Sequence, residues 1–378
     1  MPTNKNQHFV PQFYLRRFSR NQKSIEMHVL RNGATIRSAS ISDQCSKPYY
    51  YGKGDSIDSL FTSMESACSP ILNQVAAHGA NSLSETNYEM LLLFLMLQRF
   101  RTEGARRLGF EQHLEAKRRI GRELPDGVIS EIDSMPPMDH ISMSKMAIGM
   151  YPYIYDLWTT ILKAPSTCSF VTSDDPVVLF NKAGEQSRVP HSIGLSNSGL
   201  MIAFPLDPQT ALLMYDHGIY SVSENAQGRV YLSAEEVNRF NRLQFLNCSD
   251  ALYFQNADAV DIGYLRSFEK DRLSERVKFA EFTLEEDYVG THERYKRWNE
   301  GDPYDFRTSR LISFQFLPIR SNFHARFLKY KLHPRYDDTR SSGGYFRNLK
   351  FYEVCKDYAA RMKANKAKPL TLHAQRFG

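Results

Sequence analysis

Three segments of the chain concentrate residue types that do chemistry in proteins. A histidine, whose ordinary pKa is about 6.5, can transfer protons or bind a metal, although a bond to the backbone is its more common use. The first segment interleaves a histidine, glutamines and two arginines with aromatic residues. It reads Gln7-His8-Phe9-Val10-Pro11-Gln12-Phe13-Tyr14-Leu15-Arg16-Arg17-Phe18.

Pro11 organises this first segment. It restricts Val10 to extended conformations, and its fixed φ suits the first turn of a helix. We therefore expect a helix from Gln12 to about Ser19, with His8 at its entrance beside unpaired amide groups and positive partial charge. An anion is favoured at such a place. The alternative is a capped helix end in which His8 bonds to the backbone and no ligand binds.

The second segment follows a strongly apolar helix, for which a capping box at 86–89 is the predicted start. The eight apolar residues of 90–97 are too few for a bilayer, which requires about 20, so they indicate a buried central helix. Gln98 and Arg101 continue its inward stripe. A buried arginine needs an acceptor, because an unpaired buried charge is very costly. That acceptor is either an internal carboxylate or the phosphate of a ligand.

The third segment places adjacent carboxylates between two β-rich arms, in the order Thr172-Ser173-Asp174-Asp175-Pro176-Val177. Carboxylates at the end of a strand can bind Mg²⁺ or orient a histidine or an arginine. Acids in this position also form turns by accepting bonds from backbone amides. The sequence leaves both roles open.

One further amide is expected in the interior. A capping box at 233–236 begins a helix whose apolar stripe includes Asn241. A buried asparagine needs hydrogen-bond partners. Asn241 therefore braces either the site or a backbone carbonyl.

The hydrophobic periodicity predicts the elements that position these residues. Helices are expected at 55–79, with a bend at Pro70, at 86–122 and at 145–162, and a basic amphipathic helix at 345–364. Strands are expected at 25–30, 201–205, 211–215, 252–254 and 310–318, with an Asn-Gly hairpin turn at 32–33 and charged helices over much of 256–310. The fold class is thus α+β: a mostly helical N-terminal half, a central antiparallel sheet and a basic helical C-terminal extension. We expect a core domain at 1–256 and the extension at 257–378.

Composition bounds the compartment and the partners. The 378 residues are 42% hydrophobic, and the five cysteines show no CxxC spacing, which favours reduced thiols in a cytoplasmic protein. No signal peptide or membrane span is expected. Residues 321–378 hold thirteen Lys/Arg and four Asp/Glu, a net charge of +9, which leaves −3 on the preceding 320 residues of a chain whose total is +6. A basic tail suggests nucleic acid as a partner; a solubilising tail is the alternative.

These features, in this order, resemble a largely bacterial family known as domain of unknown function 4238, over about residues 7–256. The family commonly has asparagine where Asp175 stands, and this departure weakens the assignment of both acids to a metal. Its members are often encoded in mobile or defence-like neighbourhoods, which implies a role in defence or as a toxin. The resemblance rests on 8–15 with Phe18, on Gln98-x-x-Arg101-Thr102, on 172–177, on Phe204-Pro205-Leu206-Asp207-Pro208, and on Asn238-x-x-Asn241.

Two hypotheses follow. In the first, the protein acts on a phosphodiester: His8 is the general acid or base, Arg101 holds the phosphate, and Asp174 orients His8 or binds a metal. Substrate contacts would come from Gln12, Tyr14, Gln98, Arg99 and Asn241, and Mg²⁺, if used, would bind Asp174 and Asp175. In the second, the protein is a nucleic-acid- or nucleotide-binding or sensor module without chemistry. The substrate, the use of a metal and the oligomeric state stay open.

Overall fold

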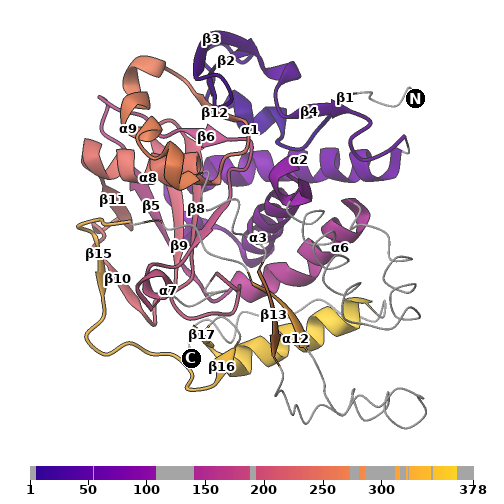
Figure 1. The fold of residues 1–378 in the computed structure, drawn as a ribbon, viewed down its shortest axis with the longest axis vertical. Coiled ribbons are helices and arrows are strands. Elements are labelled where there is room, and N and C mark those ends of the chain that lie inside the picture. The colour runs from indigo at the N-terminus through magenta and orange to yellow at the C-terminus, as the bar shows by residue number, and fades with distance from the viewer. Residues whose placement is uncertain are drawn as a thin grey trace.

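The structure, a computed structural model, confirms the predicted α+β class (Figure 1). Figure 1 shows the five-stranded sheet on the left and, to its right, the helices α3 (Glu85–Phe100), α6 (His140–Met150) and α12 (Leu349–Lys363), with α2 (Asp55–His78) running across above them. The residues it describes are 6–53, 55–107, 140–187, 193–272, 281–285, 311–315, 321, 323–341 and 344–363.

Two larger sheets form the β part of the molecule. The five-stranded sheet has the order β11-β5-β9-β8-β7, in which β11 pairs with β5 in parallel and the other pairs are antiparallel. Its strands are β5 (Trp158–Lys163), β7 (Val178–Phe180), β8 (Met201–Asp207), β9 (Thr210–Tyr215) and β11 (Arg229–Tyr231). The four-stranded sheet is antiparallel, with the order β3-β2-β12-β6. Its strands are β2 (Ser24–Val29), β3 (Ala34–Ser40), β6 (Thr172–Ser173) and β12 (Ala251–Phe254).

The five-stranded sheet separates two hydrophobic clusters. Successive side chains of a strand point to opposite faces. On β8 and β9, Ile202 and Leu212 accordingly belong to the cluster shared with α2 and α3. Met201 and Leu213 belong to the cluster shared with α8 (Ala234–Asn247). A strand buried on both faces is apolar throughout, which is why the predicted strands 201–205 and 211–215 are confirmed here.

The predicted N-cap of α8 is confirmed, whereas that of α3 is displaced along the chain. The capping box at Ser233 and Glu236 begins α8 as predicted, with the Ser233 hydroxyl accepting from the Glu236 amide at 3.3 Å. The predicted start of α3 was wrong by two residues. The N-cap is Ser84 and not Thr86, and the Ser84 hydroxyl accepts from the Asn87 amide at 3.3 Å. Gly79, at φ +82, follows the end of α2, which runs on through Pro70.

Two segments that were predicted to be helical contain strands in the structure. The end of the helix expected at 145–162 is strand β5, because its β-branched residues pair with β9 and β11 on either side. Within 256–310, β13 (Glu281–Glu285) pairs with β14 (Leu311–Gln315). The connector predicted at 123–145 lies outside the described residues up to 139, and α6 occupies 140–145.

The described parts of the C-terminal extension pack on the core. Phe351, Cys355 and Tyr358 of α12 join the cluster of α2 and α3, and Phe323 and Phe327 join the cluster of α8. The boundary between 1–256 and 257–378 stays a prediction. None of the helices in the described ranges is long and apolar enough to cross a membrane.

Candidate functional site

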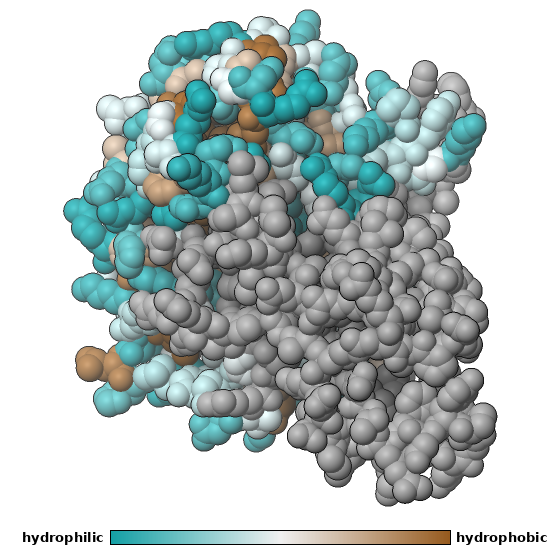
Figure 2. Space-filling view, viewed as in Figure 1, coloured by the Kyte–Doolittle hydropathy of each residue, from teal (hydrophilic) through white to brown (hydrophobic). Residues whose placement is uncertain are grey.

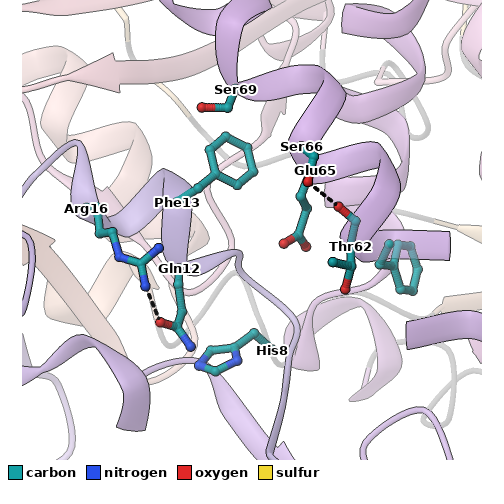
Figure 3. A pocket seen from close by; sticks show the side chains of 9 residues that line it. His8, Gln12, Phe13, Arg16, Thr62, Glu65, Ser66 and Ser69 are labelled. Atoms are coloured by element: carbon teal, nitrogen blue, oxygen red, sulfur yellow. Dashed lines mark hydrogen bonds between the residues drawn. The ribbon is translucent and has the colours of Figure 1, made fainter. Parts of the chain in front are cut away.

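A polar pocket of about 450 Å³ lies between the short helix α1 (Gln12–Arg16) and the middle of α2 (Figure 3). Figure 3 shows Glu65 reaching from α2 toward α1, with Gln12 and His8 on the far side of the space. One wall comes from the N-terminal segment and the other from α2. The lining residues are His8, Gln12, Phe13, Arg16, Phe61, Thr62, Glu65, Ser66 and Ser69.

His8 is held in place by backbone contacts. It ends β1 (Asn6–His8), which pairs antiparallel with β4 (Ser46–Pro48). Its Nε2 lies 3.1 Å from the Ser42 carbonyl oxygen. Because a carbonyl only accepts, Nε2 carries a proton in this arrangement, and Nδ1 is the second titrating atom of the ring. The Tyr51 hydroxyl donates to the His8 carbonyl at 3.0 Å. The predicted bond between His8 and the backbone is thus present, and His8 lines a pocket as well.

The α1 side of the pocket carries a positive charge. Gln12 and Arg16 are one helical turn apart, and the Arg16 guanidinium donates to the Gln12 side-chain oxygen at 2.7 Å. No carboxylate of the described chain forms an ion pair with Arg16. The helix itself is anchored by the buried Tyr14 and Leu15. Arg16 therefore keeps guanidinium donors that an anionic ligand can use.

The α2 side presents polar residues on one helical stripe. Thr62, Glu65, Ser66 and Ser69 follow the spacing i, i+3, i+4, i+7, so they share one face. The Glu65 carboxylate accepts from Arg101 Nη1 at 2.9 Å. Its side chain is 23% exposed, whereas that of Arg101 is 2% exposed. The buried Arg101 guanidinium, which lies behind α2's side of the pocket, thus holds the Glu65 carboxylate in the pocket wall.

Arg101 is enclosed by groups from several elements. Its Nε donates to the Gln98 side-chain oxygen at 2.9 Å, and its guanidinium carbon lies 4.9 Å from the centre of the Phe61 ring. Gln98 in turn donates to the Phe9 carbonyl at 3.0 Å. Arg101 Nη2 is buried without a hydrogen-bond partner among the described residues. The predicted inward stripe is therefore present, and the acceptor for Arg101 is an internal carboxylate.

The adjacent acids of the third segment lie outside this pocket. Asp174 accepts from the backbone amides of Ser249 at 2.8 Å and Asp250 at 2.6 Å. Asp175 pairs with Arg99, Oδ2 to Nη1, at 2.8 Å. The structure therefore does not bring Asp174 together with His8 and Arg101 at the pocket, as the first hypothesis expected. No three His, Cys, Asp or Glu side chains in the described ranges are grouped as a metal would require.

Asn241 and two further amides of α8 bind the backbone of the third segment. Asn241, Gln244 and Asn247 follow one another at every third position of the helix and are all buried. Together they satisfy five polar groups of 169–176, which makes Asn241 a brace for the strand segment. The bonds are Asn241 to Ser169 O at 2.8 Å and Val171 N at 2.9 Å, Gln244 to Pro176 O and Ser173 Oγ at 2.8 Å each, and Asn247 to Asp175 O at 2.7 Å.

Tyr14 is likewise used inside the fold. Its ring is fully buried and stacks on Phe204, with centroids 5.0 Å apart. Its hydroxyl donates to the Pro205 carbonyl at 2.7 Å, so the Thr172 hydroxyl, 2.8 Å away, donates to it. Burial raises the pKa of the Tyr14 hydroxyl far above its ordinary value, which keeps the phenol protonated. Tyr14 thus joins α1 to β6 and β8, away from the pocket wall.

The thiol nearest the pocket helix is not a nucleophile. Cys68 lies on α2 and is buried. Burial raises the pKa of its thiol to about 12, against a smaller lowering by Arg101. Since only the thiolate attacks, Cys68 is inert at neutral pH.

Sequence reasoning missed several pocket residues. Arg16 lines the pocket but was not assigned to a site from the sequence. Thr62, Ser66 and Ser69 were missed altogether. The usable signal is that these hydroxyls and Glu65 form a second stripe beside the apolar stripe of α2.

The comparisons with known proteins bear on the family alone. The model of a protein family described as "Protein of unknown function (DUF4238)" matches residues 6–258. This range includes the pocket, the paired residues Arg101 and Glu65, and the amides of α8. Searches among curated proteins and among solved structures gave no match.

Proposed function

The chain belongs to the DUF4238 family, and we propose that its pocket binds and cleaves a phosphodiester, with nucleic acid as the substrate class. The observation that supports this most is the composition of the pocket. A histidine and a carboxylate face the same space as an arginine that has no described carboxylate partner. Phosphodiester cleavage needs these three functions, namely a base, an acid and a cation for the phosphate.

The roles differ from those first assigned on the sequence. Arg16 binds the phosphate oxygens, with Gln12 setting its orientation through the 2.7 Å bond. Glu65, held by Arg101 at 2.9 Å, accepts the proton of the attacking oxygen. As the new phosphorus–oxygen bond forms, the bond to the leaving oxygen breaks. His8 then donates a proton to the leaving oxygen through Nδ1, while Nε2 stays bonded to Ser42.

The other residues in and behind the pocket wall support Arg16, Glu65 and His8 or offer further contacts to the substrate. Arg101 is a positioning residue, because it touches Glu65 and lies behind the pocket wall. The hydroxyls of Thr62, Ser66 and Ser69 offer donors for further phosphate or sugar oxygens along the α2 wall. Phe13 and Phe61 give the pocket its apolar surfaces.

The experiment is a cleavage assay on the full chain. Labelled RNA and DNA oligonucleotides are incubated with wild type, His8→Ala, Glu65→Gln and Arg16→Ala, each with Mg²⁺ and with EDTA. Loss of a general acid or base typically costs about 10²–10⁴-fold in rate. Arg20→Ala is the matched control, because Arg20 is exposed just beyond α1. Equal activity of His8→Ala and wild type would remove His8 from the mechanism.

The alternative function is binding without turnover, as in a nucleotide sensor. It is favoured by the structural use of residues that first suggested catalysis, namely Asp174, Asp175 and Arg99. The two functions separate in one measurement. A sensor would be stabilised by a nucleotide in a thermal shift assay, with Arg16→Ala abolishing the shift, while no product forms over hours.

We also propose a cytoplasmic location and a role in bacterial defence or as a toxin. All five cysteines are free thiols and buried, which suits a reducing compartment. The defence role rests on the family resemblance. Producing wild type and Glu65→Gln in bacteria tests it, because only the wild type should slow growth or reduce phage plaques.

A further inference from the structure

An exposed aromatic stack lies where strand β5 of the five-stranded sheet begins. The ring of Trp158, at the start of β5, stacks on His217 with centroids 3.6 Å apart and planes 4° from parallel. Trp158 is still 44% exposed. His217 lies in the turn between β9 and β10 (Tyr220–Val222). Two flat rings are thus stacked at the surface, with much of the tryptophan open to solvent.

A basic segment from the C-terminal extension is fixed against this stack. Lys331 Nζ lies 3.0 Å from His217 Nε2, and the Lys331 amide donates to the Ile219 carbonyl at 2.9 Å. The Arg335 amide donates to the Gly218 carbonyl, also at 2.9 Å. A Cβ at Gly218 would lie 2.3 Å from the Arg335 carbonyl oxygen, so only glycine permits this close approach.

The contact with Lys331 sets the protonation of His217. An ammonium group only donates, so Nε2 accepts and the ring proton lies on Nδ1. Burial, and then the charges of Lys331 and Arg335, lower the pKa of His217. The stack is therefore neutral at physiological pH, whereas the two side chains beside it are cationic.

The exposed residues of the segment alternate in character. Leu332, between the two cations, is 95% exposed. The acids that follow are at the far end of the segment, and Asp337 accepts from the Thr339 amide at 3.0 Å. Figure 2 shows hydrophobic side chains protruding among hydrophilic ones at the left margin, on the side where Figure 1 places β10 and β15 (Leu328–Tyr330). We define the basic-aromatic surface as Trp158, His217, Lys331, Leu332 and Arg335.

We propose that the basic-aromatic surface binds single-stranded nucleic acid, with a base stacked on Trp158 and backbone phosphates at Lys331 and Arg335. Stacking on aromatic side chains beside cationic groups is how proteins hold single strands without reading sequence. A duplex covers the faces of its bases and cannot stack in this way. The inference deepens the proposed function by naming the polymer, but binding at this surface does not require cleavage.

Binding is measured by fluorescence anisotropy with labelled 20-nucleotide single strands of RNA and of DNA, in EDTA. We expect Trp158→Ala to weaken binding about tenfold or more, since a stacked base contributes about 1–3 kcal/mol. The double variant Lys331→Ala with Arg335→Ala should make binding less dependent on salt. The slope of log affinity against log salt should become less negative by about 1.4, at about 0.7 per phosphate contact. The matched control is Lys23→Ala with Arg31→Ala, which removes the same charge from exposed positions elsewhere.

Trp158 can also report directly. The chain has two tryptophans, and Trp298 lies outside the described residues. In a Trp298→Phe background, Trp158 is the sole emitter, and a bound strand should quench it. Tryptophan emission that stays unchanged at a saturating concentration of the single strand overturns the proposal. Equal salt slopes for the two double variants, Lys331→Ala with Arg335→Ala and Lys23→Ala with Arg31→Ala, also overturn it. So does binding of a duplex as tightly as the single strand. A change of oligomeric state in Trp158→Ala, with strand binding intact, points instead to a protein interface and also overturns it.

Failure of this inference can be told apart from failure of the proposed function. Binding with normal affinity but no cleavage by wild type retains the surface and removes the enzyme. Cleavage of a dinucleotide that depends on Glu65, together with strand binding unaffected by Trp158→Ala, retains the enzyme and removes the surface.

Discussion

Arg101 and Glu65 form an ion pair across the wall of the pocket, with Nη1 2.9 Å from Oε1. The arginine is almost completely buried, whereas the carboxylate reaches the pocket. The interior thereby supplies a fixed charge to a site that solvent and ligand can enter. The arrangement links the stability of the fold to the state of the pocket, because each partner depends on the other.

Removing the buried partner should destabilise the protein. We expect Arg101→Ala to lower the free energy of unfolding by about 3 kcal/mol, because it breaks a largely buried pair and leaves Gln98 without its donor. Urea denaturation of the full chain measures this. Glu65→Gln serves as the comparison: it keeps an acceptor for Arg101 but leaves the buried guanidinium without its counter-charge, so it should also be destabilising. Unchanged or higher stability of Arg101→Ala would show that the arginine is held for a ligand.

Arg16 should act on affinity for the phosphate and hardly on stability. Its guanidinium bonds to Gln12 on the surface of α1, so Arg16→Ala should leave the melting temperature within about 2 °C of wild type. Turnover on a short oligonucleotide should fall by about 10²-fold or more. Arg16→Lys, which keeps the charge but loses the two-pronged geometry, should recover only part of it. Full activity in Arg16→Ala would assign the phosphate to another cation.

Asn241 should matter for folding alone. Asn241→Ala leaves the Val171 amide and the Ser169 carbonyl unsatisfied in the interior, at a cost of about 1–3 kcal/mol for each such group. Asn238→Ala, one turn earlier on the same helix and partly exposed, is the control and should stay within about 0.5 kcal/mol of wild type. Activity per folded molecule should be unchanged. A catalytic role for Asn241 would appear as lost turnover at full stability.

Glu103 should make stability depend on acidic pH. Burial alone would raise the pKa of its carboxyl, but hydrogen bonds from Arg106 at 2.7 Å and Lys47 at 3.0 Å outweigh burial and lower it. A carboxyl whose pKa is lowered by folding stabilises the protein above its unfolded pKa of about 4.3. That contribution is lost as the pH falls through the folded pKa. The melting temperature should therefore fall more steeply below about pH 4.5 in wild type than in Glu103→Gln. Parallel profiles would contradict this.

Local chemistry explains why much of the fold could be predicted. The capping box at Ser233 is complete within four residues, and the runs of β8 and β9 are apolar on both faces. Where two residues can each cap a helix, the predicted start was displaced: both Ser84 and Thr86 are possible N-caps of α3, and the structure uses Ser84. Residues 158–162 of β5 were assigned to a helix because the strand partners, β9 and β11, come some fifty or more residues later in the chain.

The site was predictable only in part, because it depends on pairs that are distant in sequence. The inward direction of Gln98 and Arg101 follows from helical periodicity, and His8 does line a pocket. The partner of Arg101 could not be chosen from the sequence, since any internal carboxylate satisfies the same requirement. Asp174 was assigned to orient His8 or to bind a metal, but its carboxylate accepts from the backbone amides of 249–250.

The amides of α8 hold main-chain atoms at all three of their positions. Asn247, in particular, binds the carbonyl oxygen of Asp175. An exchange of aspartate for asparagine at 175 would therefore keep this main-chain attachment and remove the negative charge beside Arg99. Evolution can in this way retune the local charge of the segment while its path through the protein stays the same.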